Sequence, residues 1–169
     1  MQIINPATEE IIGQLMEDTE ASIGQKYNAL CVGQEHWAML GLAERVACIE
    51  QFYAMLESEK KVLAETLTQE SGKPLQQSYN ELNGARSRIR WLVDHAAKWL
   101  AEEWIVSDGA TREKIVYEPL GVIANISAWN YPYLVGVNVF VPALLGGNAV
   151  LYKPSEYATL TGLQIQRLL

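Results

Sequence analysis

Two short stretches of this sequence combine polar side chains with apolar surroundings, as binding and catalytic sites do. The first, Ser-Ala-Trp-Asn at 127–130, follows the apolar run 121–126, and the second, Lys-Pro-Ser-Glu at 153–156, closes the apolar run 149–155. Both runs are typical of strands buried on both faces of a parallel sheet. In open α/β sheets, ligands bind beyond the carboxyl ends of such strands. The sequence therefore predicts one cleft to which both stretches contribute.

Asn130 has the clearest chemical use in the first stretch. Pro132 suits the first turn of a helix, where its missing N–H costs little, so Asn130 would be held close to a helix N-terminus. A fixed carboxamide N–H in an apolar cleft stabilises a developing oxyanion, and losing one such donor costs about 10²–10³ in rate. The alternative, which the sequence leaves open, is that Asn130 simply caps the helix.

Lys153 and Glu156 form the charged pair of the second stretch. A carboxylate at a strand end suits a ribose, whose hydroxyls donate to it, and it would repel a 2′-phosphate. Two other interpretations stay open: an exposed ion pair of little energetic weight, or an acidic residue in the first turn of the next helix. No Gly-x-Gly-x-x-Gly motif occurs, so any nucleotide is held without that fingerprint.

The surrounding segments have the order of a βαβ unit. Strand 121–126, an apolar helix over 132–145 and strand 149–155 predict a right-handed parallel crossover, and another helix begins near Thr159. We therefore expect an α/β fold: amino-terminal helices plus the incomplete start of a doubly wound, Rossmann-like parallel sheet. Typical sheets have about five or six strands, so two strands indicate part of something larger. The open strand edge predicts self-association.

The residues before this unit are mainly helical in pattern. Apolar spacings of three and four predict helices over 18–38, 42–57, 58–71 and 75–103, with a loop near 33–41 and Ser58 as an N-cap. Gly72, followed by Pro74, predicts the end of the third helix. A strand is expected at 11–15, a turn at Asp108-Gly109, and a strand with one solvated face at 111–119.

Bulk properties argue against several kinds of partner. The 169 residues are 49% hydrophobic and 20% charged, which is typical of a globular domain, and the net charge is −7. Such an acidic chain lacks the basic stripe of a nucleic-acid surface. Its apolar runs are too interrupted for a membrane span, its N-terminus does not resemble a signal peptide, and Cys31 and Cys48 lack zinc-site spacing. We expect a cytoplasmic protein without a bound metal.

Five segments together resemble one known family. NPATEEIIGQL, ESGKPLQQSYNEL, YEPLGVIANISAWNYP, PALLGGNAV and KPSE are similar, in order and spacing, to the amino-terminal third of the aldehyde dehydrogenase superfamily. The start at Met1, just before NPAT, is similar to short bacterial members such as succinate-semialdehyde dehydrogenases. The resemblance implies a homo-oligomeric enzyme that oxidises an aldehyde to an acid with NAD or NADP, using a nucleophilic cysteine and a general-base glutamate.

The resemblance also implies roles for single residues. Asn130 corresponds to the asparagine that forms the oxyanion hole with a backbone N–H, and Trp129 and Ile126 correspond to residues that line the cofactor cleft. Lys153 and Glu156 correspond to residues that hold the adenosine ribose, and the carboxylate favours NAD over NADP. The expected cofactor-binding set is Ile126, Ser127, Trp129, Asn130, Lys153, Pro154, Ser155 and Glu156.

By the same resemblance the chain divides into three parts. Residues 1–110 form the helical part of the cofactor-binding domain, 111–120 a strand of the oligomerisation arm, and 121–169 the truncated first βαβ unit of the NAD-binding sheet. Two positions depart from the family: Val139 stands where members often carry lysine, and Ala128 replaces a frequent proline.

The resemblance also concerns what the chain does not contain. The nucleophilic cysteine and the general-base glutamate would lie beyond its last residue, so we expect this chain alone to be inactive. The alternative is a non-catalytic module of the same fold that binds a nucleotide or a partner.

Overall fold

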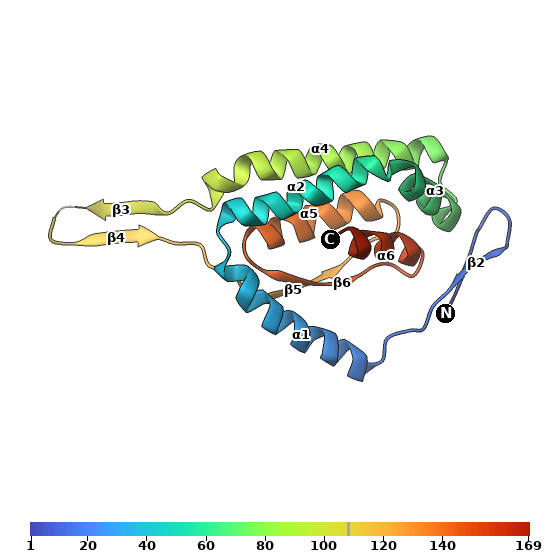
Figure 1. Ribbon diagram of the computed structural model, residues 1–169, viewed down its shortest axis with the longest axis horizontal. Helices are drawn as coiled ribbons and strands as arrows, with labels where there is room; N and C mark the ends of the chain where they lie inside the picture. The colour runs from blue at the N-terminus through green and yellow to red at the C-terminus, as the bar shows by residue number, and fades with distance from the viewer. Residues whose placement is uncertain (108) are drawn as a thin grey trace.

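The structure of the protein is a computed structural model that describes residues 1–107 and 109–169, so the first residue of the predicted Asp108-Gly109 turn lies outside the described residues. The helices and strands follow one another along the chain as shown in Figure 1. In order, they are β1 (Gln2–Ile4), β2 (Ile11–Gln14), α1 (Glu20–Met39), α2 (Leu42–Ser58), α3 (Lys60–Ser71), α4 (Leu75–Trp99), β3 (Glu103–Ser107), β4 (Arg112–Ile115), β5 (Val122–Ile126), α5 (Pro132–Leu145), β6 (Ala149–Lys153) and α6 (Thr159–Leu168).

The strands pair in twos within the described residues. β1 pairs antiparallel with β2, and β3 with β4, whereas β5 and β6 are parallel and are joined through α5. The register of the parallel pair runs from Val122 opposite Ala149 to Ile126 opposite Lys153. The predicted βαβ unit is therefore confirmed, together with the α/β fold class.

The core lies between α5 and the long helices α2 and α4. Its centre is aromatic and aliphatic: Phe52 and Phe140 meet edge-on with ring centroids 5.7 Å apart, and Leu82 and Ile89 of α4 are fully buried beside them. In Figure 1 the β5–β6 sheet lies between α5 and α1. This packing leaves the carboxyl ends of β5 and β6 free to carry a site.

Two residues tie α1 to the turn that follows α5. Gln34 Nε2 donates to the Gly147 carbonyl at 3.0 Å, and Trp37 Nε1 donates to the Leu144 carbonyl at 2.8 Å. These contacts keep α1 helical through residue 39, so the predicted loop near 33–41 is wrong. Intrinsic propensity disfavours Gly33 in a helix by about 1 kcal/mol, and tertiary contacts outweigh that cost.

Two other boundaries also differ from the sequence prediction. Ser58 ends α2 instead of capping the next helix, and α4 stops at Trp99 rather than near 103. The residues 103–107 instead form β3, which pairs with β4 at 112–115. This strand was not predicted, because its partner β4 is what stabilises it.

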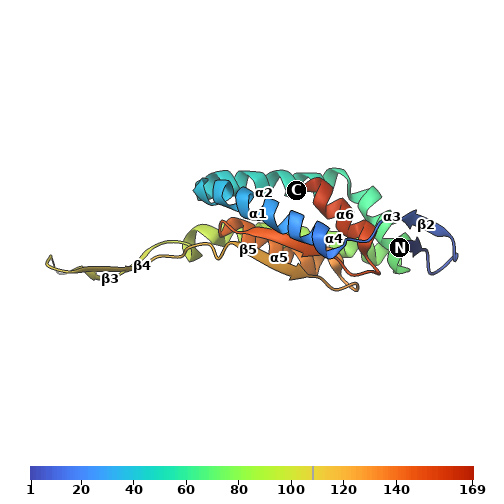
Figure 2. The same cartoon turned by 90° about the horizontal axis from the view of Figure 1, so that it is seen from below.

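The β3–β4 hairpin projects from the body of the molecule, as Figure 2 shows. Its Trp104 is half exposed and packs beside the cations Arg112 and Lys114 of the facing strand. The strand predicted at 111–119 is therefore the shorter β4, one half of a two-stranded arm, and all four of its residues are exposed where one solvated face was expected. In the part of the chain that the structure describes, no helix is long and apolar enough to cross a bilayer.

Candidate functional site at the carboxyl ends of β5 and β6

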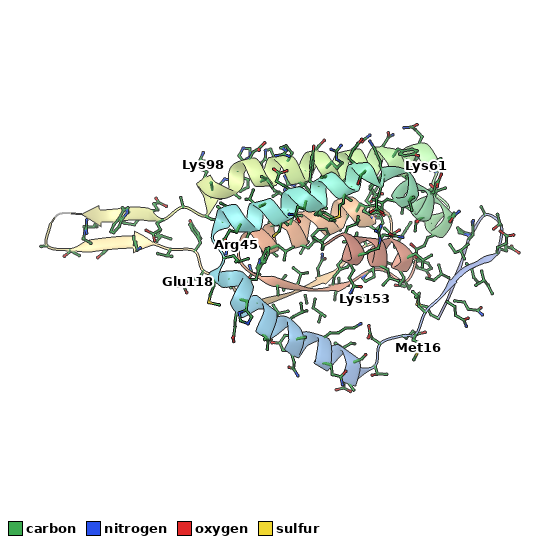
Figure 3. The ribbon with its side chains drawn as sticks, viewed as in Figure 1. Met16, Arg45, Lys61, Lys98, Glu118 and Lys153 are labelled. Atoms are coloured by element: carbon green, nitrogen blue, oxygen red, sulfur yellow. The ribbon has the colours of Figure 1, made fainter. Side chains whose placement is uncertain are left out.

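The two predicted stretches lie side by side. Ile126 is the register partner of Lys153, and the Ser127 backbone N–H donates to the Lys153 carbonyl at 3.0 Å. Figure 3 marks Lys153 at the end of β6. Parallel pairing thus brings residues about 27 positions apart in sequence to one edge of the sheet.

Several of the predicted site residues are open to solvent. Ile126 is 78% exposed and Trp129 is 56% exposed, which is unusual for large apolar side chains at a strand end. The Lys153 Nζ lies 3.5 Å from a Glu156 oxygen, and both side chains are more than half exposed. The pKa of Glu156 is lowered, first by a hydrogen bond from its own backbone N–H and then by the Lys153 charge. Glu156 therefore keeps its negative charge more readily, and both side chains are accessible to a polar ligand.

The other predicted residues support the loops from inside. Ser127 and Ser155 are buried. The Ser155 hydroxyl donates to Glu156 at 3.3 Å and accepts from the Tyr157 backbone N–H at 3.3 Å. Pro154 packs against Gly162 of α6. Ser155 and Pro154 therefore shape the loop that presents Lys153 and Glu156.

Two hollows flank the first stretch. A groove of about 860 Å³ lies between the N-terminal hairpin and the loops after the strands, and Trp129, Glu156 and Tyr157 form part of its wall. A smaller cavity of about 290 Å³ is lined by Tyr131 and by residues of α4 and α5. Asn130 lies in the chain between Trp129, which faces the groove, and Tyr131, which faces the cavity.

Asn130 does not cap α5. The N-cap residue is Tyr131, and it supplies no side-chain hydrogen bond to the helix. Asn130 is exposed and its carboxamide makes no hydrogen bond to any described residue. The carboxamide is therefore available as a donor, which favours the oxyanion interpretation of this residue over the capping one.

The actual cap of α5 is Glu81, a residue that the sequence analysis did not single out. Its Oε1 accepts from the backbone N–H of Tyr133 at 2.8 Å and of Leu134 at 3.4 Å. Its Oε2 lies 2.5 Å from Lys73 Nζ. Burial is the first effect on its carboxyl and raises the pKa, while Lys73 and the two N–H groups oppose that shift.

Glu70 plays the same part for α6. Its two oxygens accept from the Leu160 N–H at 2.6 Å and the Thr161 N–H at 2.9 Å, and its burial raises the pKa of the carboxyl. The helix hairpin α3–α4 thus holds both loops of the candidate site. In the sequence, Glu70 and Glu81 stand out only as glutamates among the apolar positions of a helix. That pattern does not show which group each glutamate contacts.

These two carboxylates restrict where a phosphate can sit. Helix N-termini commonly bind phosphates through free backbone N–H groups. At α5 and α6 those groups already donate to Glu81 and Glu70, and an added anion would meet a carboxylate. The N-termini of α5 and α6 are therefore not free phosphate-binding sites.

Comparison with known proteins agrees with this geometry. The pattern of the aldehyde dehydrogenase family matches residues 1–169, and the chain belongs to that family. N-succinylglutamate 5-semialdehyde dehydrogenase of Acinetobacter baylyi is 32% identical over 156 residues, which are 90% of this chain and 31% of the relative. Succinate semialdehyde dehydrogenase of the same organism is 31% identical over 168 residues, 98% of this chain and 34% of the relative. The chain thus spans about a third of the length of these relatives.

Solved structures show the same fold. Succinate-semialdehyde dehydrogenase from Burkholderia pseudomallei matches with a TM-score of 0.92 at 29% identity, covering 99% of this chain and 35% of that one. A variant of betaine aldehyde dehydrogenase from Staphylococcus aureus, solved in complex with NAD+, matches with a TM-score of 0.93 at 29% identity over the same shares. An NADP-dependent enzyme of E. coli matches with a TM-score of 0.92 at 25% identity and the same coverage.

Proposed function

We propose that this chain is the amino-terminal part of an NAD(P)-dependent aldehyde dehydrogenase that oxidises an aldehyde to a carboxylic acid. Within that enzyme it supplies one wall of the cofactor cleft and one donor of the oxyanion hole. The observation that carries the proposal is the position of Asn130, between a groove bounded by Trp129 and Glu156 and a cavity bounded by Tyr131. Hydride transfer requires a cofactor and a substrate to meet at one point, and a groove and a cavity on either side of Asn130 support such a meeting.

The roles of the individual residues follow from their exposure and charge. Ile126 and Trp129 offer exposed apolar surface to the cofactor, and Glu156 accepts from ribose hydroxyls while Lys153 holds its carboxylate in place. Asn130 donates to the oxyanion that forms on the aldehyde carbonyl. NAD is favoured over NADP because a 2′-phosphate would lie against Glu156.

The division of the chain follows the same proposal. Residues 1–110 and 121–169 belong to the cofactor-binding domain, except that β3 (Glu103–Ser107) pairs with β4 and extends with the arm. The arm around 111–120 pairs with a second copy of the chain in a homo-oligomer, since its strand is solvated and projects from the body. The proposed enzyme works in the cytoplasm.

Calorimetric titration of the chain with NAD and NADP tests the cofactor part. We expect NAD to bind more tightly than NADP, and Glu156→Gln to weaken NAD binding and to narrow the difference between the two. Lys61→Met is the matched control because Lys61 is 78% exposed on α3, away from the sheet edge (Figure 3). If NAD and NADP bound with equal affinity, and Glu156→Gln changed neither affinity, Glu156 would not be the residue that binds the ribose.

A chimera tests the catalytic part. Residues 1–169 replace the matching first third of the Acinetobacter baylyi succinate semialdehyde dehydrogenase, and NADH formation from succinate semialdehyde is followed. Asn130→Ala should lower kcat by about 10²–10³-fold. A chimera that is folded and binds NAD but is indifferent to Asn130→Ala would favour the non-catalytic module instead.

A further inference from the structure

An ion pair lies directly beneath the loop that carries Asn130. Lys73 Nζ is 2.5 Å from Glu81 Oε2, with the Glu81 side chain fully buried and that of Lys73 only 11% exposed. The same ammonium lies 4.3 Å from the centroid of the Tyr131 ring. A buried pair of this kind costs desolvation energy, so it is weak evidence for stability by itself. Its position next to the Asn130 loop suggests a role in the candidate site.

The pair holds the backbone that follows the Asn130 side chain. Lys73 Nζ donates to the Asn130 carbonyl at 2.6 Å, and Glu81 accepts from the backbone N–H groups of Tyr133 and Leu134. The Asn130 carboxamide itself has no hydrogen-bond partner among the described residues. The contact that is present holds the peptide that joins Asn130 to Tyr131.

A tight turn delivers Lys73 to this position. Gly72 ends α3 with φ of 70°, the left-handed conformation that glycine adopts without strain. A Cβ at Gly72 would also lie 2.9 Å from Pro6 Cγ. Pro74 then starts α4, on which Glu81 lies two turns further along. The Gly-Lys-Pro sequence thus places a lysine and a glutamate of the same hairpin against one loop.

We propose that Lys73 and Glu81 are positioning residues that fix the direction of the Asn130 carboxamide. The proposal rests on the proposed function of Asn130 and adds how that donor is held. Fixing the backbone leaves both carboxamide N–H bonds free for a ligand, whereas a hydrogen bond to the side chain would occupy one of them. Preorganised donors of this kind need no reorganisation when charge develops on the substrate.

The first experiment measures how rigid the peptide between Asn130 and Tyr131 is, in the 169-residue chain. The N–H of Tyr131 belongs to the same peptide plane as the Asn130 carbonyl, so its NMR order parameter reports what Lys73 restrains. We expect a value of about 0.85 in the wild type, and a value below about 0.6 in Lys73→Met. Lys73→Arg keeps the charge and should restore the rigid value, and Lys61→Met should leave it unchanged.

If Lys73→Met does not fold, Glu81→Gln takes its place, since the amide oxygen keeps one acceptor for the Tyr133 N–H while Lys73 loses its counter-charge. The order parameter of Tyr131 should then fall as well. A Tyr131 N–H that stays rigid in the folded variant overturns the proposal.

The second experiment is a double-mutant cycle in the chimera described above. Lys73→Met should lower kcat by about 10²-fold with KM unchanged, as expected when a donor to the transition state is misplaced. In the Asn130→Ala background the same substitution should cost nothing more, because the group that it positions is gone. A merely structural role would give equal losses in both backgrounds and would overturn the proposal.

The two experiments separate the proposal from the function on which it rests. A chimera that does not respond to Asn130→Ala defeats the proposed function, while the order parameter of Tyr131 still decides whether Lys73 restrains the loop. A chimera that responds to Asn130→Ala but not to Lys73→Met keeps the function and defeats the positioning role.

Discussion

Gly162, at the start of α6, packs so closely against Pro154 that a Cβ at Gly162 would lie 2.5 Å from the Pro154 Cβ. Contact at that distance forces the backbone apart, and overpacking of this kind costs about 1–3 kcal/mol. The relationship matters because Pro154 lies between Lys153 and Glu156. Helix α6 therefore fixes the loop that presents the charged pair.

Gly162→Ala should accordingly lower the free energy of unfolding by about 1–3 kcal/mol in urea denaturation and weaken binding of NAD. Gly24→Ala is the matched control, since nothing lies within 4 Å of a Cβ at Gly24 in α1. That substitution should stabilise the chain by about 0.5–1 kcal/mol, because alanine is the better helix former. Equal effects at the two glycines would show that α6 does not press on the Pro154 loop.

The buried Glu70 predicts a pH dependence of stability. Its pKa is raised above the ordinary 4.5, chiefly by burial. The folded state therefore binds a proton more tightly than the unfolded state, and the resulting stability is complete below pH 4.5 and is lost as pH rises through the folded pKa. The wild type should lose this contribution over that window, whereas Glu70→Gln should not. Denaturation curves measured between about pH 4 and pH 8 test this. If the free energy of unfolding changed with pH in the same way in both proteins, Glu70 would not be the group responsible.

Substitution by alanine should lower the free energy of unfolding far more at Asn148 than at Asn130. The Asn148 Oδ1 accepts from the Leu120 N–H at 2.6 Å and the Gly121 N–H at 3.1 Å, and its Nδ2 donates to the Ala143 carbonyl at 3.1 Å. Asn148→Ala should therefore cost about 2–3 kcal/mol. Asn130→Ala should change stability by less than about 0.5 kcal/mol, because the exposed side chain has no described partner. Thermal unfolding of both variants makes the comparison, and a large loss at Asn130 would point to a structural role instead.

The open edge of β6 predicts that the isolated chain self-associates. Ala149 donates to Gly121 and Lys153 accepts from Ser127, so these residues point their backbone groups at β5. The N–H and C=O groups of successive residues point to opposite sides of a strand. The Val150 N–H therefore points to the side on which no described strand pairs with β6. Sedimentation at micromolar concentration should show oligomers.

Val150→Pro should reduce that association and retain the fold, because proline removes only an outward N–H. Leu151→Pro removes an N–H that points to β5 and should unfold the unit. A wild-type chain that sediments as a monodisperse monomer would rule out the edge as a site of association.

The βαβ unit and the residues at its two strand ends were predictable from sequence because their signals are local. Continuous apolar runs indicate strands of a parallel sheet, although β5 and β6 are only partly buried here, and Pro132 marks a helix start one residue after Tyr131. The end of α3 at Gly72 was predictable for the same reason, because it depends on the left-handed backbone conformation that glycine itself adopts. The predictions failed at 33–41, where contacts with Gly147 outweigh local preference, at Ser58, which ends α2, and at 100–107, where the predicted helix ran too far and the strand β3 was missed.

Sequence by itself indicated the candidate residues for the chemistry: an asparagine after one predicted strand, and a lysine and a glutamate at the end of the next. Only the tertiary structure decided how they are held. Glu70 and Glu81 lie on α3 and α4, yet they cap α6 and α5, which begin about 90 and 52 residues later. No pattern of spacing contains that information, because a carboxylate meets a helix N-terminus so distant in sequence only when packing of the whole core brings the two together.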